Sequence, residues 1–257
     1  MEPVRSPRNQ RVAAAVRLQR ARERALTGKT LLEGPNLLEA AIEGRVAVGP
    51  VFALEDDAKT ASLVMAEGWE LVTVAQSVLD RLAPTQHPRG PVAVVDIPPS
   101  TEISDRNVLV LWGVGDPGNA GTLMRTAAAF GCGVVFGPDS VDPWNPKVLR
   151  SAAGAHFRTP IERDLAGMST LAARGFRTVA SVVRQGSSPT VLDNTRRTAI
   201  LVGAEAHGLP EEIISACDLQ VTIPMQVGTE SLNASVAGSI LLYELAAQVE
   251  SSSPSHD

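Results

Sequence analysis

The second half of the chain alternates short apolar runs with helical segments, and this alternation restricts the possible folds more than any other feature. The apolar runs occupy residues 107–114, 133–137, 176–183, 197–205 and 219–225. Helical segments separate most of them, and a final helix is expected within residues 228–245. Strands and helices in this order predict an α/β domain that is built on a mostly parallel sheet.

The first half shows the same alternation in a weaker form. A helix is expected over residues 11–26, which contain no Gly or Pro and are rich in Ala, Arg, Leu and Glu. Shorter helices and strands follow, so a small α/β layer domain is predicted over residues 1–97. The polar segment 98–106, with its paired prolines, is the expected linker. Residues 107–250 are predicted to form the second domain, and residues 251–257 a disordered tail.

The overall composition is that of a soluble globular protein. Of the 257 residues, 44% are hydrophobic and 20% are charged, and no apolar run is long enough to cross a membrane. The amino terminus lacks the apolar segment of a signal peptide. Cys132 and Cys217 are too few for a disulfide framework and have no zinc-binding spacing. We therefore expect reduced thiols, no metal site, no membrane contact and a cytoplasmic location.

Positive charge is concentrated at the amino terminus of an otherwise acidic chain. The net charge is −5, yet residues 1–30 hold eight Arg or Lys residues against two Glu residues. A basic segment on an acidic body indicates a local contact with a polyanion, although a solvated helix face is the alternative. Residues 1–30 contain no aromatic side chain, which argues against base stacking there but not against phosphate contacts.

The stretch GVGDPG, residues 113–118, matches the G-x-G-x-x-G pattern of dinucleotide-binding proteins. It follows a predicted strand, and Asp139 lies about where a ribose-binding acid is expected. However, Pro117 removes one of the backbone amides that a pyrophosphate would need. A nicotinamide-dependent oxidoreductase is therefore kept only as an alternative.

The helix that follows this stretch carries one ionisable side chain among small and apolar neighbours. Asn119 is expected to cap the helix by accepting hydrogen bonds from the amides of its first turn. Arg125 follows six residues later, and Met124, Ala127 and Ala128 lie around it. An exposed Arg of no special role is the alternative, but its position on a packing helix favours a functional role.

Two further strand ends carry glycine together with small polar or ionisable residues. In residues 199–210, Gly203 and Gly208 flank Glu205 and His207, and His207 is read as an ordinary polar residue. In residues 221–238, a loop that contains Ser231 and Asn233 leads into the last helix. Ligands collect at the strand ends of such sheets, so three loops of this kind indicate one pocket.

Together the three loops resemble the three motifs of the SpoU (TrmH-like) RNA ribose 2′-O-methyltransferases, within the SPOUT superfamily. The similar stretches are NAGTLMRTAAAFG (119–131), LVGAEAHGLP (201–210) and IPMQVGTESLNASVAGSILLYE (223–244). The resemblance covers residues 107–250. The first half is similar to the L30e-like RNA-binding domain of this family through LLEGPNLLEAAIEG (31–44) and TQHPRGPVAVV (85–95).

The resemblance implies a fold, a cofactor and a set of site residues. The carboxy-terminal segment would form a deep trefoil knot, and S-adenosylmethionine would bind in it, held largely by backbone groups. The positions that match the family's cofactor contacts are Gly203, Ile223 and Leu232, with Met225 as a wall of the same site. The positions that match its polar active-site set are Asn119, Arg125, Glu205, Ser231 and Asn233.

The resemblance also implies a reaction and a quaternary structure. A homodimer would transfer a methyl group to a ribose 2′-hydroxyl of rRNA or tRNA, with Arg125 of one chain beside the cofactor of the other. Arg125 would stabilise the developing alkoxide by about 3–4 kcal/mol. Because a guanidinium is effectively always protonated, Arg125 fits a role as base less well.

The remaining site residues would position the reactants and the RNA. Ser231 and Asn233 would orient the ribose, and Glu205 would bind backbone amides or a polar partner. RNA contacts are predicted at Arg17, Arg20 and Arg24. The other alternative, a nonenzymatic RNA-binding relative, is expected to lack Arg125, Asn233 or the turn at Gly203, and this chain retains all three.

Overall fold

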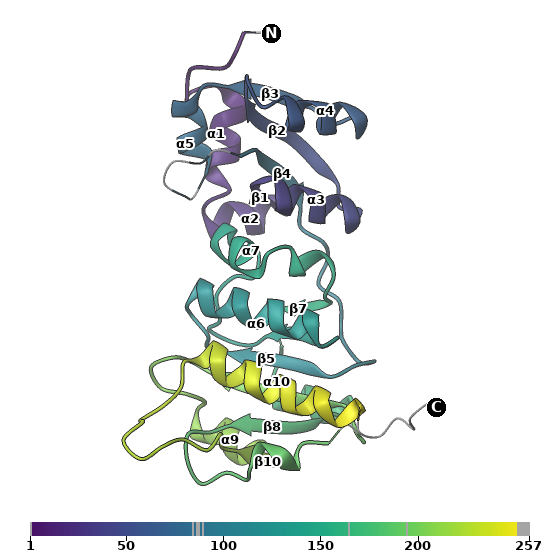
Figure 1. The fold of residues 1–257 in the computed structure, drawn as a ribbon, viewed down its shortest axis with the longest axis vertical. Helices are drawn as coiled ribbons and strands as arrows, with labels where there is room; N and C mark the ends of the chain where they lie inside the picture. The colour runs from purple at the N-terminus through teal and green to yellow at the C-terminus, as the bar shows by residue number, and fades with distance from the viewer. Residues whose placement is uncertain are drawn as a thin grey trace. The chain divides into compact units, whose positions relative to one another are not determined.

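The computed structural model describes residues 2–83, 85, 88, 90–163, 165–193 and 195–250. The chain forms two compact units. Figure 1 labels the helices and strands along the ribbon. The first unit contains Met1–Pro99 and Asp142–Phe157, and the second contains Ser100–Val141 and Arg158–Asp257. No helix in the described part of the chain is both long and apolar enough to span a membrane. The tail predicted at residues 251–257 lies outside the described residues.

The first unit is built on a four-stranded sheet with the strand order β1-β4-β2-β3. The strands are β1 (Lys29–Glu33), β2 (Val48–Leu54), β3 (Leu71–Val74) and β4 (Val92–Asp96). Strand β4 runs antiparallel to β1 and β2, whereas β2 and β3 are parallel. The helices are α1 (Gln10–Arg17), α2 (Ala21–Thr27), α3 (Pro35–Glu43), α4 (Ala58–Ala66) and α5 (Gln76–Leu82). Val12 of α1 and Leu79 of α5 are fully buried in one core with Phe52 of β2.

The single helix predicted over residues 11–26 was wrong, because two helices lie there. Helix α1 ends at Arg17, and Arg20 has an extended backbone before α2 begins. The guanidinium of Arg24 donates from Nη1 to the carbonyls of Leu18 at 2.9 Å and Gln19 at 3.0 Å. Leu18 is the C-cap of α1 and Gln19 follows it, so these carbonyls lie just beyond the end of the helix. A side chain from the next helix therefore stabilises a break that composition does not reveal.

A segment of the second half of the sequence packs into the first unit. Residues 142–157 contain α7 (Pro146–Ala152) and the short 3-10 helix η1 (Ala155–Phe157). The hydroxyl of Thr30 in β1 donates to the carbonyl of Trp144 at 2.7 Å, and Gly154 packs closely against Ala40 of α3. The sequence placed this segment inside the 107–250 domain, so its grouping with the first unit is a feature that the sequence did not indicate.

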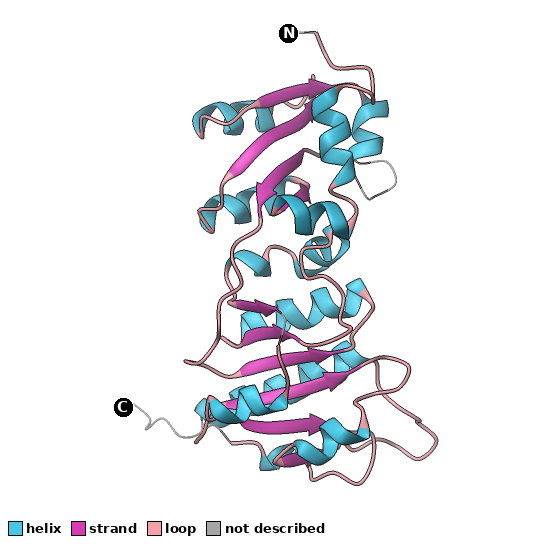
Figure 2. Cartoon of the chain, turned by 180° about the vertical axis from the view of Figure 1, so that it is seen from behind, coloured by secondary structure: helices cyan, strands magenta, loops and turns pink. Residues whose placement is uncertain are grey.

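The second unit is built on a six-stranded sheet with the order β10-β8-β9-β5-β6-β7. Its strands are β5 (Val108–Trp112), β6 (Gly133–Phe136), β7 (Ile161–Arg163), β8 (Arg177–Ser181), β9 (Thr198–Gly203) and β10 (Leu219–Val221). Every pairing is parallel, and the strand arrows of this sheet point the same way in Figure 2. The predicted α/β fold with a parallel sheet is confirmed, whereas the trefoil knot stays a prediction.

Helices cover both faces of this sheet. Helices α6 (Pro117–Ala129) and α10 (Ala234–Glu250) lie side by side (Figure 1). At Gly238 of α10 an added Cβ would lie 2.5 Å from the side chain of Leu123 in α6, so the helices approach closely there. Helices α8 (Met168–Ala173) and α9 (Glu211–Ala216) contribute Leu171 and Ile213 to another buried cluster, together with Leu201 of β9. The 3-10 helix η2 (Pro189–Val191) precedes β9.

Candidate active site

A cavity of about 320 Å³ lies where three parallel strands of the second unit end. The end of β8 contributes Ser181, Val182 and Val183, and the end of β9 contributes residues 202–208. Beyond β10 the chain contributes Ile223 and Met225, and the approach to α10 contributes Ser231, Leu232, Ala234 and Ala237. The carboxyl ends of parallel strands meet at one edge of a sheet, which explains why loops far apart in sequence converge here.

Gly203 allows the backbone to fold closely on itself at this edge. A Cβ at this position would lie 2.2 Å from the carbonyl carbon of Gly208 and 2.3 Å from the amide nitrogen of Leu209. The amide of Ala204 also donates to the carbonyl of Gly208 at 3.1 Å. Because all of these neighbours are backbone atoms, a side chain at residue 203 would force the loop apart. A glycine is therefore required for the shape of the cavity.

The carboxylate of Glu205 lines the cavity and connects two of the converging loops. It accepts hydrogen bonds from the amides of Gly115 at 3.3 Å and Asp116 at 3.2 Å, in the loop after β5. It also accepts a hydrogen bond from Nδ2 of Asn119 at 2.9 Å. Burial acts to raise the pKa of Glu205, but the bonds from Asn119 and from backbone amides outweigh it and lower the pKa. Glu205 is therefore an ionised acceptor at neutral pH, which suits a group that holds loops in place.

Asn119 and Asn233 extend this network to the start of α10. Nδ2 of Asn233 donates to Oδ1 of Asn119 at 3.0 Å, which joins the third loop to the other two. Oδ1 of Asn233 accepts hydrogen bonds from the amide of Ser235 at 2.8 Å and from its hydroxyl at 2.6 Å. The polar start of the apolar helix α10 thus serves both its capping and a contact between loops.

The prediction that Asn119 caps α6 was wrong. Helix α6 begins at Pro117, and its cap is Asp116, whose carboxylate accepts a hydrogen bond from the amide of Asn119 at 2.8 Å. Proline favours the first position of a helix, so the sequence did contain the signal for Asp116. With Asp116 as the cap, the side chain of Asn119 is free to bind Glu205.

Arg125 lies two turns further along α6 and does not join this network. Its side chain is exposed, it makes no hydrogen bond or ion pair with any residue that the structure describes, and it does not line the cavity. Thr122, one turn earlier on α6, lines a shallow groove of about 330 Å³ with residues of α10. Because residues three apart share a helix face, Arg125 lies on the same face of α6 as Thr122.

Comparison with known proteins agrees with this architecture. Residues 106–243 match the model of the SpoU rRNA Methylase family, which covers more than half of the chain. The chain belongs to the SpoU rRNA methylase family. Residues 9–93 match a second model, that of the MRM3-like substrate binding domain. The predicted resemblance to SpoU enzymes is thereby confirmed.

The chain is also similar to individual proteins over nearly its whole length. It is 31% identical to the 23S rRNA (guanosine(2553)-2′-O)-methyltransferase RlmP of Bacillus subtilis (strain 168), over 95% of this chain and 99% of that protein. The crystal structure of the SpoU methyltransferase AviRb from Streptomyces viridochromogenes with AdoMet has 28% identity and a TM-score of 0.85, covering 95% of this chain and 99% of AviRb. An RNA 2′-O ribose methyltransferase structure has 27% identity and a TM-score of 0.83, covering 97% and 100%.

The structure gathers most of the predicted site residues of this SpoU chain. The predicted cofactor contacts Gly203, Ile223, Met225 and Leu232 all line the cavity, as do Glu205 and Ser231. Sequence reasoning missed the end of β8, which includes Ser181 and Val183, and it discounted His207, which lines the same cavity. The signal for β8 was available, because its apolar run was recognised and parallel strands end at the same edge.

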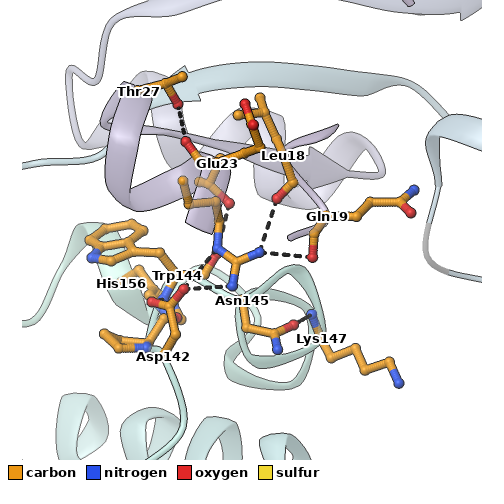
Figure 3. Close-up of polar contacts among 12 residues, drawn as sticks. Leu18, Gln19, Glu23, Thr27, Asp142, Trp144, Asn145, Lys147 and His156 are labelled. Carbon is orange, nitrogen blue, oxygen red and sulfur yellow. Dashed lines mark hydrogen bonds and ion pairs between the residues drawn. The ribbon is translucent and has the colours of Figure 1, made fainter. Parts of the chain in front are cut away.

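The prediction that Arg24 contacts RNA was wrong. The residue is only 3% exposed, and its Nε and Nη2 bind Oδ2 of Asp142 at 2.8 and 2.6 Å. Figure 3 shows the carbonyls of Leu18 and Gln19 and the carboxylate of Asp142 around this guanidinium. A guanidinium that is buried among these partners is not accessible to an RNA phosphate. Arg17 and Arg20 remain exposed, so their RNA contacts stay predictions.

Three further observations concern metal, thiol and dinucleotide chemistry. No group of three or more His, Cys, Asp or Glu residues that the structure describes lies close enough to hold a metal ion. Burial raises the pKa values of Cys132 and Cys217 to about 11, so both thiols are protonated at neutral pH. In the GVGDPG stretch, the amides of Gly115 and Asp116 are already bound to Glu205, and a pyrophosphate would have to displace that carboxylate.

Proposed function

We propose that this SpoU chain transfers a methyl group from S-adenosylmethionine to a ribose 2′-hydroxyl of rRNA or tRNA. The observation that carries the proposal is the network of Glu205, Asn119 and Asn233, which fixes three loops beside the cavity at the strand ends. The similarity to RlmP, named as a 23S rRNA 2′-O-methyltransferase, and to AviRb with AdoMet supports the same reaction. Family membership alone does not identify where in this chain the reaction takes place.

The cavity suits a cationic methyl donor with a flat base. Its walls include the apolar side chains of Ile223, Met225 and Leu232, and Gly203 exposes backbone groups at its edge. Of the charged side-chain types, the described lining offers the carboxylate of Glu205 and no Lys or Arg, so a sulfonium group is not repelled. When bound there, S-adenosylmethionine supplies an electrophilic methyl group.

The side chains around the cavity would hold the ribose and stabilise the charge that develops on its oxygen. Asn119 and Asn233 fix each other, and each amide retains hydrogen-bonding capacity for a sugar hydroxyl. Glu205 is occupied by backbone and amide donors, so it positions Asn119 rather than taking a proton. A guanidinium beside the developing alkoxide would contribute about 3–4 kcal/mol, and Arg125 is proposed for this role.

The exposed position of Arg125 supports a homodimer in which this residue acts on the partner's site. Helix α10 presents apolar side chains to solvent beside α6, with Val236 at 46% and Tyr243 at 59% exposure. Single exposed apolar residues are common, but here the two flank one groove that Ile240 also lines. A second copy packed on this face by a two-fold axis would bring Arg125 to the other chain.

Mixing two inactive variants tests this arrangement. One chain carries Arg125→Ala with an intact cavity, and the other carries Gly203→Ala with an intact arginine. If Arg125 acts across the dimer, random pairing restores about a quarter of the wild-type activity, because half of the dimers hold one complete site of two. If Arg125 acts within its own chain, the mixture stays inactive.

The RNA would be held by the first unit through exposed arginines at the end of α1, between α1 and α2, and on α2. Arg17 and Arg20 are exposed, and the ion pair of Arg17 with Glu23 is long, at 3.6 Å. Arg22 is exposed on the same short helix as Arg24 and is a better candidate than that residue. The match of residues 9–93 to a substrate binding domain supports this assignment.

Calorimetry and methyl transfer together test the proposed function. The chain is titrated with S-adenosylmethionine and with NAD, and it is then incubated with methyl-labelled S-adenosylmethionine and ribosomal or transfer RNA. We expect binding of S-adenosylmethionine, no binding of NAD, and label in 2′-O-methylnucleosides after digestion. Tight NAD binding without a response to S-adenosylmethionine would overturn the proposal, as would label found on bases.

A further inference from the structure

Arg24 and Asp142 form an ion pair that lies outside the candidate active site. Arg24 is buried, and the side chain of Asp142 is 29% exposed. Oδ1 of Asp142 also accepts a hydrogen bond from the amide of Trp144 at 2.9 Å, so both of its oxygens are engaged. The pair joins helix α2, the end of α1 and the start of the 142–157 segment within the first unit (Figure 3).

Asp142 directly follows Ser140 and Val141 in the chain. These two residues bind the end of β5 and the loop after it, residues 113–116, which we call the β5 loop. The amide of Val141 donates to the carbonyl of Val114 at 2.9 Å. The hydroxyl of Ser140 donates to the carbonyl of Leu111 at 2.8 Å and accepts from the amide of Gly113 at 3.0 Å. Residues 140–141 are therefore bound to the backbone on both sides of the end of β5.

The same β5 loop supplies the backbone amides that bind Glu205. Gly115 and Asp116 follow Val114 directly, and both donate to the Glu205 carboxylate. Asp116 also caps α6, the helix that carries Asn119 and Arg125. A shift of residues 140–142 would therefore move the amides that fix Glu205, and with them the side chain of Asn119.

We propose that Arg24 and Asp142 are positioning residues for methyl transfer, which tie the helices of the first unit to the loop that orients Glu205 and Asn119. The inference rests on the proposed function. Arg24 lies on α2 shortly after the exposed arginines that are proposed to contact RNA, so a displacement of α1 and α2 by RNA reaches Asp142 through two hydrogen bonds. The first unit then affects the rate of the reaction as well as the affinity for RNA.

The variant Asp142→Asn tests the proposal, and Asp96→Asn is its matched control. Asp96 forms an exposed ion pair with Lys29 in the same unit, with no link to the β5 loop. In Asp142→Asn we expect faster hydrogen exchange in a peptide that spans residues 113–122. We also expect kcat to fall by about 10- to 100-fold, with the KM for RNA and the affinity for S-adenosylmethionine within about twofold of wild type. The control should match wild type in every measurement.

The outcomes separate this proposal from the proposed function. Wild-type exchange and kcat in Asp142→Asn would overturn the proposal, and a change in RNA KM alone would do so too. If Asp142→Asn does not fold, Ser140→Ala is tested in its place. This variant removes the hydrogen bonds of the Ser140 hydroxyl with Leu111 and Gly113 in the second unit. Wild-type kcat in Ser140→Ala would then overturn the proposal. If the wild-type chain methylates no RNA, the proposed function fails first, while the exchange data still show whether the pair holds the loop.

Discussion

Two polar clusters of this protein hold charged side chains in opposite ways. Around Glu205 the carboxylate is exposed, and it lies beside a cavity. Around Arg24 the guanidinium is buried, and it is surrounded by a carboxylate and two backbone carbonyls. The Glu205 carboxylate fixes the loops beside the cavity while it stays accessible to solvent. The buried guanidinium of Arg24 is instead saturated by protein groups, because an unpaired buried charge is costly.

The two arginines Arg24 and Arg125 show the same contrast within one residue type. Arg24 was taken from its sequence neighbourhood as an RNA contact, and the structure buries it. Arg125 lies on a helix of small and apolar residues, and the structure leaves it exposed with no partner among the described residues. Exposure and lack of a partner, rather than local charge density, distinguish the arginine that is available to a ligand.

Substitution of Arg125 should give the largest functional effect. In Arg125→Ala we expect methyl transfer to fall by about 10²–10³-fold, because one well-aimed charge stabilises the alkoxide. Affinity for S-adenosylmethionine and the free energy of unfolding should change little, since the side chain makes no described contact. Single-turnover assays with saturating RNA measure the effect. The control is Arg196→Ala, which removes another exposed arginine of the second unit. An equal loss of methyl transfer in that variant would mean that Arg125 has no specific role.

Substitution of Arg24 should instead reduce stability. Arg24→Met removes the partner of Asp142 and leaves two carbonyls without a donor. We expect the free energy of unfolding of the first unit to fall by about 3 kcal/mol. Denaturant titration followed by the fluorescence of Trp69 and Trp144 measures it. Lys29→Gln, which breaks an exposed ion pair of the same unit, should cost less than about 1 kcal/mol. Equal effects would mean that burial of the pair has no energetic consequence.

His156 should make the first unit sensitive to acid. Burial lowers its pKa to about 4, although its bond to the carbonyl of Pro143 opposes this. The unfolded chain binds a proton near pH 6.5 and the folded chain does not until about pH 4, so stability decreases as the pH falls through this window. Between pH 7 and pH 4.5 we expect a loss of about 2–3 kcal/mol. The loss should be absent in His156→Gln when unfolding is measured across the same pH values, and an identical pH profile would contradict this.

Arg17 at the end of α1 and Arg20 just before α2 should each contribute least. In a variant with Arg17→Gln and Arg20→Gln we expect RNA affinity to fall and the slope of log affinity against log salt to decrease in magnitude by about 1–2. Titrations at several salt concentrations measure this slope. Lys59→Gln removes an exposed cation elsewhere in the first unit and serves as control. An unchanged slope in the double variant would place the RNA contact on another surface.

Much of the second unit could be predicted from sequence, because parallel strands are buried on both faces and appear as continuous apolar runs. The runs that contain Val110, Val135 and Leu201 are all central strands of the sheet. Strand β7 was missed because it is a three-residue edge strand without such a run. The convergence of Asn119, Glu205 and Asn233 followed from the rule that parallel strands end at one edge.

The partners of individual side chains were less predictable. Arg24 binds Asp142 across 118 residues of sequence, and no local pattern announces such a contact. The grouping of residues 142–157 with the first unit could not be predicted for the same reason. It depends on packing against β1 and α3, which are far away in sequence, rather than on local preference. The cap of α6 was different. Pro117 at the first helical position indicates Asp116 as the cap, although Asn119 is also a residue type that favours caps.

Mapping of ribose methylation on total RNA tests the central claim most directly. RNA from cells with and without the protein is hydrolysed in alkali, which cleaves next to every ribose except those with a 2′-O-methyl group. We predict at least one protected position that requires the protein and is lost when Arg125→Ala replaces the wild-type chain. Identical protection in all three samples would contradict the claim that this site holds a methyl donor against a ribose oxygen.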